Sequence, residues 1–148
     1  MEREMSEVDR LKHGAAKLLL IWSIISIVIG ATLSLGSSNT ILNGIGLQAV
    51  IWGIIDAVIG LSILFKQEEQ SVEKIAKTVS VSIRFDIIFQ VAGLIVILIF
   101  LQNPYYMGNG IGVVIQGFFL FLLDNNYLKS LKNLQIKKEL KTRDYAFE

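Results

Sequence analysis

Three aspartates stand inside or at the edge of long apolar stretches, where a charged side chain is unusual: Asp56, Asp86 and Asp124. Ionisable residues inside a membrane are energetically costly and are candidates for proton or cation binding. Asp56 lies near the middle of its stretch with no basic residue close to it, so it is the best single candidate for such a site. Asp86 and Asp124 are expected at a similar shallow depth near the cytoplasmic ends of their stretches, where Arg84 is available as a counter-charge, so we predict that Arg84 forms an ion pair with Asp86 or with Asp124.

Three glutamines extend this candidate polar site, because residues three, four, seven or eight apart share one face of a helix. Two interpretations are open. The polar residues either line a cavity that binds a proton or a cation, or bond one another and hold the helices together, since polar side chains in hydrocarbon need partners. The three glutamines are Gln48, Gln90 and Gln116. The polar or small residues on the same faces of their predicted helices are Trp52 and Gly60, Gly93, and Gly112, and the first predicted helix has a similar face with Ser23, Ser26 and Gly30.

Other kinds of site are poorly supported by the residue types. The chain has no cysteine and one histidine, His13, which lies outside the apolar stretches. A thiolate or histidine metal site and a histidine-dependent catalytic triad need residues that this sequence does not supply. We therefore expect no catalytic residue, no metal and no cofactor. We also expect that the protein is not an enzyme and does not bind nucleic acid.

Stretches with few or no charges occupy most of the chain, which has 148 residues, of which 53% are hydrophobic. A helix rises 1.5 Å per residue, so about 20 apolar residues cross the hydrocarbon core of a bilayer. The sequence therefore predicts an all-α integral membrane four-helix bundle. The first stretch is longer than the apolar core of a signal peptide, which favours an uncleaved span. The four predicted spans are residues 18–35, 45–65, 79–101 and 110–128.

The two ends of the chain carry many charges. Residues 1–17 mix acidic and basic side chains and predict a short lead-in helix. In residues 129–148, Leu131, Leu134 and Leu140 are interleaved with lysines, which predicts a basic amphipathic helix rather than a fifth span. Such a helix is attracted to anionic lipid headgroups, and the alternative is a solvated tail.

The distribution of basic residues predicts the orientation. All 14 lysines and arginines lie in the N-terminal segment, in residues 66–84 or in the C-terminal tail, and residues 36–44 and 102–110 contain none. Cytoplasmic loops carry an excess of lysine and arginine. We therefore expect a protein of the cell (inner) membrane with both termini in the cytoplasm and the lipid bilayer as its surroundings.

A short motif occurs twice, each time at the start of a long apolar stretch. It is Asn-Gly-Ile-Gly, at residues 43–46 and again at residues 109–112. The repetition predicts that the chain consists of two copies of one helical hairpin. Because each hairpin would begin and end on the same side of the membrane, the two would be parallel repeats about an axis along the membrane normal.

Residues of the last three predicted spans form a combined pattern, which comprises Trp52, Asp86 and Gly93, Gly110 and Gly112, and Gln116, Gly117, Phe119, Leu120 and Asp124. This pattern resembles an uncharacterised family of small prokaryotic membrane proteins with four transmembrane helices, a domain of unknown function. The resemblance covers roughly Leu11 to Leu131 and is most specific between Gln116 and Asp124. It implies the fold and the membrane location, and it implies no activity.

Two functions from different classes fit these observations. The first is a structural or accessory membrane component that packs through small and polar helix faces, as a homo-oligomer or within a larger membrane complex. The second is a cation- or proton-coupled transporter or channel subunit that uses the intramembrane carboxylates. A cavity around Asp56 would favour the second, and polar stripes that seal against each other would favour the first.

Overall fold

The computed structural model describes residues 6–66 and 70–145, and the described chain consists of four helices. They are α1 (Glu7–Gly36), α2 (Thr40–Phe65), α3 (Val72–Ile99) and α4 (Pro104–Tyr145). No strand occurs in these residues. The predicted all-α fold with four helices is therefore confirmed.

Helices α1, α2 and α3 each follow a residue whose side chain bonds free backbone amides of the helix. The side chain of Ser6 accepts from the Asp9 backbone N–H, and the side chain of Asn39 accepts from two backbone N–H groups of α2. Ser71 caps α3 in the same way. Pro104 opens α4, where its missing N–H is not needed by the helix. These residue types are the ones preferred at helix starts, so the helix starts follow from local sequence.

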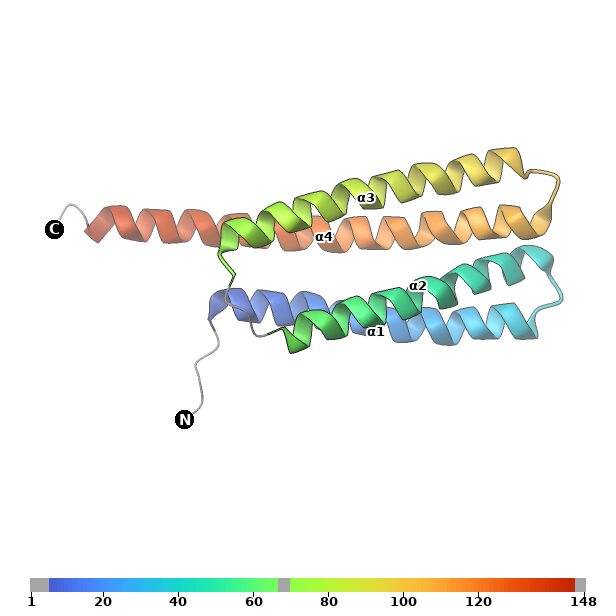
Figure 1. The fold of residues 1–148 in the computed structure, drawn as a ribbon, viewed down its shortest axis with the longest axis horizontal. Helices are drawn as coiled ribbons and strands as arrows, with labels where there is room; N and C mark the ends of the chain where they lie inside the picture. Colours follow the sequence, from blue (N-terminus) through green and yellow to red (C-terminus); the bar gives the residue numbers. More distant parts are fainter. Residues whose placement is uncertain (1–5, 67–69, 146–148) are drawn as a thin grey trace.

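The helices form two antiparallel hairpins that lie side by side (Figure 1). Helix α1 packs on α2, α3 packs on α4, and the hairpins meet chiefly through α2 and α4. The connections 37–39 and 100–103 lie at one end of the bundle, termed here the two-loop end. The connection between α2 and α3 lies at the opposite end together with both chain ends, and this is termed the termini end (Figure 1).

The charged segments at the two ends of the chain are not separate helices. Within the described residues the predicted lead-in segment is continuous with α1, and residues 129–145 continue α4 without a break. Helix α4 therefore projects straight beyond the other three (Figure 1). The predicted basic C-terminal helix is thus the last part of α4. Leu131 and Leu134 are buried, and the Lys137 ammonium lies 3.2 Å from a carboxylate oxygen of Glu7, so the start of this extension packs near α1.

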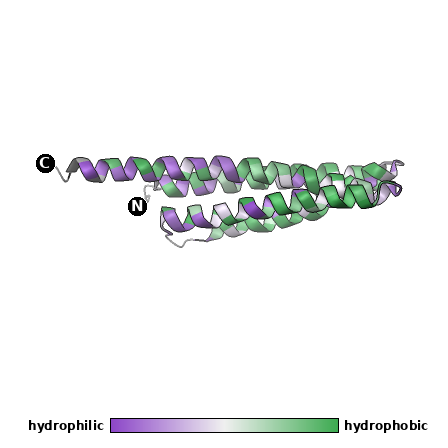
Figure 2. Ribbon diagram, turned by 90° about the horizontal axis from the view of Figure 1, so that it is seen from above, coloured by the Kyte–Doolittle hydropathy of each residue, from purple (hydrophilic) through white to green (hydrophobic). Residues whose placement is uncertain are grey.

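Hydrophobic residues dominate the helices away from the termini end, and hydrophilic residues gather toward that end (Figure 2). Each helix exposes large hydrophobic side chains, among them Ile24, Ile54, Ile88 and Phe118. All four helices are long and apolar enough to cross a membrane. In water such a continuous apolar surface would be unusual for a monomer, whereas it matches the hydrocarbon of a bilayer.

Glycines allow the two helices of each hairpin to approach closely. A Cβ atom on Gly30 would lie 2.7 Å from the carbonyl oxygen of Gly46, and one on Gly93 would lie 2.8 Å from the carbonyl oxygen of Gly110. Small residues at helix contacts permit this approach in membrane proteins. The Gly30–Gly46 contact of the first hairpin thus has a counterpart in the Gly93–Gly110 contact of the second.

A second pair of contacts follows the same rule. Gly53 faces the backbone of Ser23, where a Cβ would lie 2.9 Å from the carbonyl oxygen. Gly117 faces the backbone of Asp86, and the corresponding distance is 3.2 Å. Ser23 precedes Gly30 by seven residues, as Asp86 precedes Gly93, and Gly53 follows Gly46 by seven residues, as Gly117 follows Gly110. The hairpins therefore share their internal helix contacts in register.

This register differs from that of the Asn-Gly-Ile-Gly motif. Gly46, the second glycine of the first copy, occupies the place of Gly110, the first glycine of the second copy. The other two glycines face across the hairpins, Gly44 toward Asn109 and Gly112 toward Gln48. Residues two apart lie on nearly opposite sides of a helix. In each copy of the motif, therefore, one glycine contacts the other helix of its own hairpin and the other glycine faces the second hairpin, and the two glycines exchange these roles between the copies.

Candidate functional site

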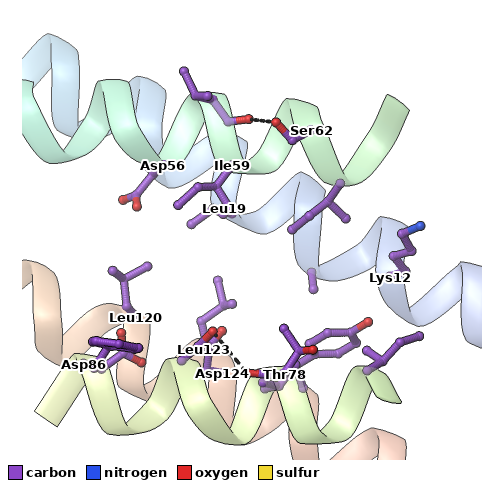
Figure 3. Close-up of a pocket in the computed structure, with 18 of the residues that line it drawn as sticks. Lys12, Leu19, Asp56, Ile59, Ser62, Thr78, Asp86, Leu120, Leu123 and Asp124 are labelled. Atoms are coloured by element: carbon purple, nitrogen blue, oxygen red, sulfur yellow. Dashed lines mark hydrogen bonds between the residues drawn. The ribbon is translucent and has the colours of Figure 1, made fainter. Parts of the chain in front are cut away.

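A cavity of about 730 Å³ lies between α2 and α3, with α1 and α4 forming its floor. Helices α2 and α3 barely touch each other, which leaves space between them. The cavity extends from Trp52 and Asp56 toward the termini end, where Lys12, Lys66 and Lys74 line it. All three aspartates that the sequence singled out line this cavity (Figure 3).

Asp56 is the most enclosed of the three aspartates. It is 0% exposed, and neither carboxylate oxygen has a hydrogen-bond partner among the described residues. Its position follows from the glycines on the same face of α2, because Gly53 and Gly60 let α1 pack closely on either side of it. Its carboxylate points into the space between the hairpins (Figure 3). A buried carboxyl without a partner is energetically costly, which makes Asp56 the strongest candidate for a binding role.

Asp86 and Asp124 approach the same space from the second hairpin (Figure 3). Asp86 is 6% exposed, and its Oδ2 atom has no hydrogen-bond partner among the described residues. Asp124 is half-buried and lies seven residues after Gly117, which is the residue that faces Asp86. Seven residues of helix span about 10 Å, so Asp124 lies closer to the termini end than Asp86 does.

Arg84 does not join this group. Its side chain is exposed, and within the described part of the chain no ion pair links it to Asp86 or to Asp124. The predicted ion pair is therefore absent. The reason is geometric, since two residues of helix correspond to a rotation of about 200° and turn Arg84 away from the face that carries Asp86.

The three glutamines form bonds between helices. The Trp22 indole N–H donates to Gln116 Oε1 at 2.7 Å, and Gln116 Nε2 donates to Ser26 Oγ at 3.2 Å, which joins α1 to α4. The Trp22 ring also stacks on Phe119, with ring centroids 3.8 Å apart. Gln116 is thus satisfied by α1, as the packing interpretation expects.

The other two glutamines also bond their neighbours. Gln48 Nε2 donates to Asn109 Oδ1 at 2.9 Å across α2 and α4. Gln90 Nε2 lies within 3.4 Å of the carbonyl oxygens of Asp86 and Gly117. None of the three glutamines lines the cavity. The predicted polar site therefore divides into an acidic cavity and a set of amide contacts that hold the helices together.

Aromatic residues in the cavity were not predicted as part of the site. Trp52 and Phe89 meet edge to face, with centroids 4.9 Å apart and an interplanar angle of 77°. Phe85 and Tyr127 also line the cavity. The signal was present in the spacing, because Trp52 precedes Asp56 by four residues and Phe89 follows Asp86 by three. Such positions share a helix face with the aspartate.

The three carboxylates are spread along the cavity. Among the described residues, no group of three or more His, Cys, Asp or Glu side chains is placed to hold a metal ion. The site therefore consists of separate acidic groups set in a mostly apolar and aromatic wall, with lysines at the termini end. The acidic groups can compensate positive charge at several depths in the cavity.

The fold and the cavity define an all-helical protein with four helices able to cross a membrane and three acidic side chains between them. Residues 18–125 match a family that is described as a family of unknown function (DUF6992), and the chain belongs to this family. The matched residues include all three aspartates and leave out the projecting part of α4. No curated protein and no solved structure matches the chain.

Proposed function

We propose that this protein is a prokaryotic integral membrane protein whose cavity binds a cation, and that it acts as a cation- or proton-coupled transporter or channel subunit. The single observation that supports this most is Asp56, which is completely buried in a cavity of about 730 Å³ and has no partner for either oxygen. An intramembrane carboxylate without a counter-charge is unfavourable, and a bound cation supplies that charge.

The proposal includes a topology. The two hairpins are parallel repeats, supported by their matching glycine contacts, and they span the cell (inner) membrane with both termini and the α2–α3 connection in the cytoplasm. Support comes from the basic residues, which gather at the termini end, and from residues 36–44 and 102–110 at the other end, which contain none. The cavity then extends toward the cytoplasm.

Cysteine labelling tests this orientation, since the chain has no cysteine of its own. Single Ser38→Cys and Gln102→Cys substitutions place a thiol in each connection of the two-loop end, and both positions are exposed. They should react in intact cells with a membrane-impermeant maleimide. Glu73→Cys, at an exposed position of the termini end, should react only after the cells are opened. Labelling of Glu73→Cys in intact cells would reverse the topology.

A structural or accessory role is the second candidate, and the bonded glutamines favour it. Gln116 and Gln48 join α1 to α4 and α2 to α4, so part of the polar stripe serves packing. On this reading the apolar outer surface serves homo-oligomerisation or a larger membrane complex. The two candidates differ in one respect, because only the first requires Asp56 to bind a cation.

The two tryptophans provide a test of cation binding, because Trp52 lines the cavity and Trp22 does not. Trp22→Phe leaves Trp52 as the only tryptophan, and Trp52→Phe leaves Trp22 as the matched control. Each variant, in lipid nanodiscs, is titrated with sodium, potassium, ammonium and organic ammonium chlorides. At least one cation should change Trp52 fluorescence with saturation, should leave Trp22 unchanged, and should lose its effect in Asp56→Asn. If no cation does so, the transporter proposal fails and the accessory role remains.

A further inference from the structure

We propose that the cation bound in the cavity is an organic ammonium ion with an apolar body. This inference rests on the proposed cation-binding function and names the ligand class of the same site. The deep part of the cavity, around Asp56, Trp52 and Phe89, would hold the ammonium group. The apolar walls would hold the rest of the ligand.

The placement of the acidic groups argues for a ligand larger than a bare metal ion. Mg²⁺ and Ca²⁺ take several oxygen ligands at 2.0–2.6 Å. Among the described residues, no group of three or more His, Cys, Asp or Glu side chains is placed to hold such an ion. Asp124 is displaced along the bundle from Asp86 by about two helical turns. The carboxylates are therefore spread along the cavity and are not gathered as one group of three, which suits a ligand that extends along the cavity.

The walls argue for an apolar body on that cation. Between Asp56 and Asp124 the cavity is lined by Leu19, Ile59, Leu120 and Leu123. Its volume of about 730 Å³ lies in the range of pockets that enclose drug-sized molecules, about 300 to 1,000 Å³. A small hydrated ion would leave these apolar walls without contacts, whereas alkyl or aryl groups would bury against them.

Aromatic rings next to the buried carboxylate argue for an ammonium head. Trp52 and Phe89 stand edge to face, 4.9 Å between centroids, and Trp52 lies one helical turn from Asp56 on α2. Aromatic faces attract organic cations, and quaternary ammonium groups are the ligands that aromatic cages recognise. A carboxylate and aromatic rings around one space therefore favour an ammonium group over a neutral molecule.

The side of the cavity gives such a ligand a route from the bilayer. Val58, Ile59 and Phe85 line the cavity and are 59%, 46% and 54% exposed, so the cavity is not sealed where these side chains lie. Helices α2 and α3, which carry these residues, barely touch each other. A cation with an apolar body partitions into a membrane and reaches this side, while the lysines at the termini end orient its charge toward Asp56.

Benzyltrimethylammonium and its uncharged isostere neopentylbenzene test the proposal, because they differ at one atom, which is a positively charged nitrogen in the first and a neutral carbon in the second. The Trp22→Phe protein in phosphatidylcholine nanodiscs is titrated with each, and Trp52 fluorescence is measured. We expect saturable binding of benzyltrimethylammonium, and no comparable response to neopentylbenzene, sodium or potassium. Asp56→Asn should weaken binding by about tenfold or more, because the buried counter-charge is lost. Trp52→Phe, which reports through Trp22, should show no response.

A second variant keeps the test valid if Asp56→Asn fails to fold. Phe89→Leu keeps an apolar side chain and removes the ring beside Trp52, so benzyltrimethylammonium binding should weaken by about threefold or more. Phe100→Leu is the matched control, because Phe100 is as exposed as Phe89, at 39%, and does not line the cavity. The Phe100→Leu variant should bind benzyltrimethylammonium as tightly as the Trp22→Phe parent protein does. Equilibrium dialysis with radiolabelled ligand checks both variants independently of fluorescence.

The possible outcomes separate this inference from the proposed function. A response to sodium or potassium but not to benzyltrimethylammonium keeps cation binding and overturns the organic ligand. Equal binding of neopentylbenzene shows an apolar pocket and overturns the inference, as does displacement by added lipid alone. Equal loss of affinity in Phe89→Leu and Phe100→Leu overturns the role of the aromatic wall. The absence of any cation response removes both proposals.

Discussion

In the repeat α3 corresponds to α1 and α4 corresponds to α2, so the α1–α4 side of the bundle corresponds to the α2–α3 side. The α1–α4 side is closed, whereas the α2–α3 side is open. Gln116 stands one residue before Gly117, and Trp52 stands one residue before Gly53. On the closed side Gln116 bonds Trp22 and Ser26. On the open side the hydrogen-bonding partners are replaced by aromatic rings.

The matching residues explain this difference. Ser26 and Phe89 each stand four residues before the glycine that contacts the partner helix, Gly30 in the first hairpin and Gly93 in the second. An amide and a hydroxyl draw α1 and α4 together, whereas Trp52 and Phe89 hold α2 and α3 apart around a cavity. The same glycine contacts support both sides. The difference shows that helix approach within a hairpin and opening between hairpins are set by separate residues.

The acidic residues follow the same division. Where the second hairpin has Asp86, the first has Ser23, whose hydroxyl donates to the Leu20 carbonyl oxygen at 2.7 Å. Ser23 is therefore satisfied within its own helix, and Asp86 Oδ2 lacks a partner among the described residues. Charge without compensation is concentrated on the open side, which is the reason that this side is the candidate site.

The largest effect should come from the contacts that both hairpins share. Gly30→Ala and Gly93→Ala each place a Cβ less than 3 Å from the backbone of the facing helix. Each should lower the free energy of unfolding by about 1–3 kcal/mol, and the two losses should add because the sites are far apart. Denaturation in detergent micelles measures this. Gly14→Ala, where a Cβ meets nothing within 4 Å, is the control and should not destabilise.

An effect of opposite sign, about the size of one glycine substitution and smaller than the two together, should follow when the open side is given the residue of the closed side. Asp86→Ser introduces the residue found at the matching position and removes a buried oxygen that has no partner. It should stabilise the protein by about 1–3 kcal/mol and weaken cation binding at the cavity. A loss of stability in the same denaturation experiment would show that Asp86 is compensated and would remove it from the site.

Breaking the closed side should cost less. Gln116→Leu leaves the Trp22 indole N–H without its acceptor and removes the bond to Ser26. The expected loss is about 1–2 kcal/mol, with Trp52 fluorescence and cation affinity unchanged. A drop in cation affinity equal to that of Asp56→Asn would show that the two sides are coupled rather than independent.

The smallest effect should come from Arg84. Its side chain is exposed and lies away from the cavity, so Arg84→Ala should change neither the melting temperature nor the cation response. The double variants with Asp86→Ala and with Asp124→Ala should behave as the aspartate single variants do. A non-additive pair in this double-mutant cycle would restore the ion pair that the sequence suggested.

Much of the fold follows from local sequence. Long apolar stretches, the capping residues Asn39 and Ser71, and Pro104 are enough to predict four helices. The pattern around Gln116 to Asp124 predicts an uncharacterised family, and the chain does match a family of unknown function. Asp56 stands out because a carboxylate inside an apolar stretch is costly wherever the helix is placed. These features depend on one segment at a time, so the sequence reveals them.

The remaining features depend on rotation between helices, which a single segment does not specify. Arg84 is close to Asp86 in sequence but faces away from it, and the copies of the Asn-Gly-Ile-Gly motif differ in which glycine meets the partner helix. The aromatic wall escaped prediction because apolar rings such as Phe89 fit a core or a lipid-facing surface equally well. Only the separation of α2 from α3 makes them part of a cavity.

The uninterrupted course of α4 has a mechanical consequence. At 1.5 Å per residue its 42 residues extend about 63 Å, roughly twice the thickness of a bilayer core. Asp124 lies near the middle of this rod, with the cavity on one side and the projecting segment on the other. Because the rod has no break between the two, a tilt of α4 beside the cavity would swing its far end through a comparable distance. The unbroken helix thus joins the acidic cavity rigidly to the part of α4 that projects beyond the other three helices.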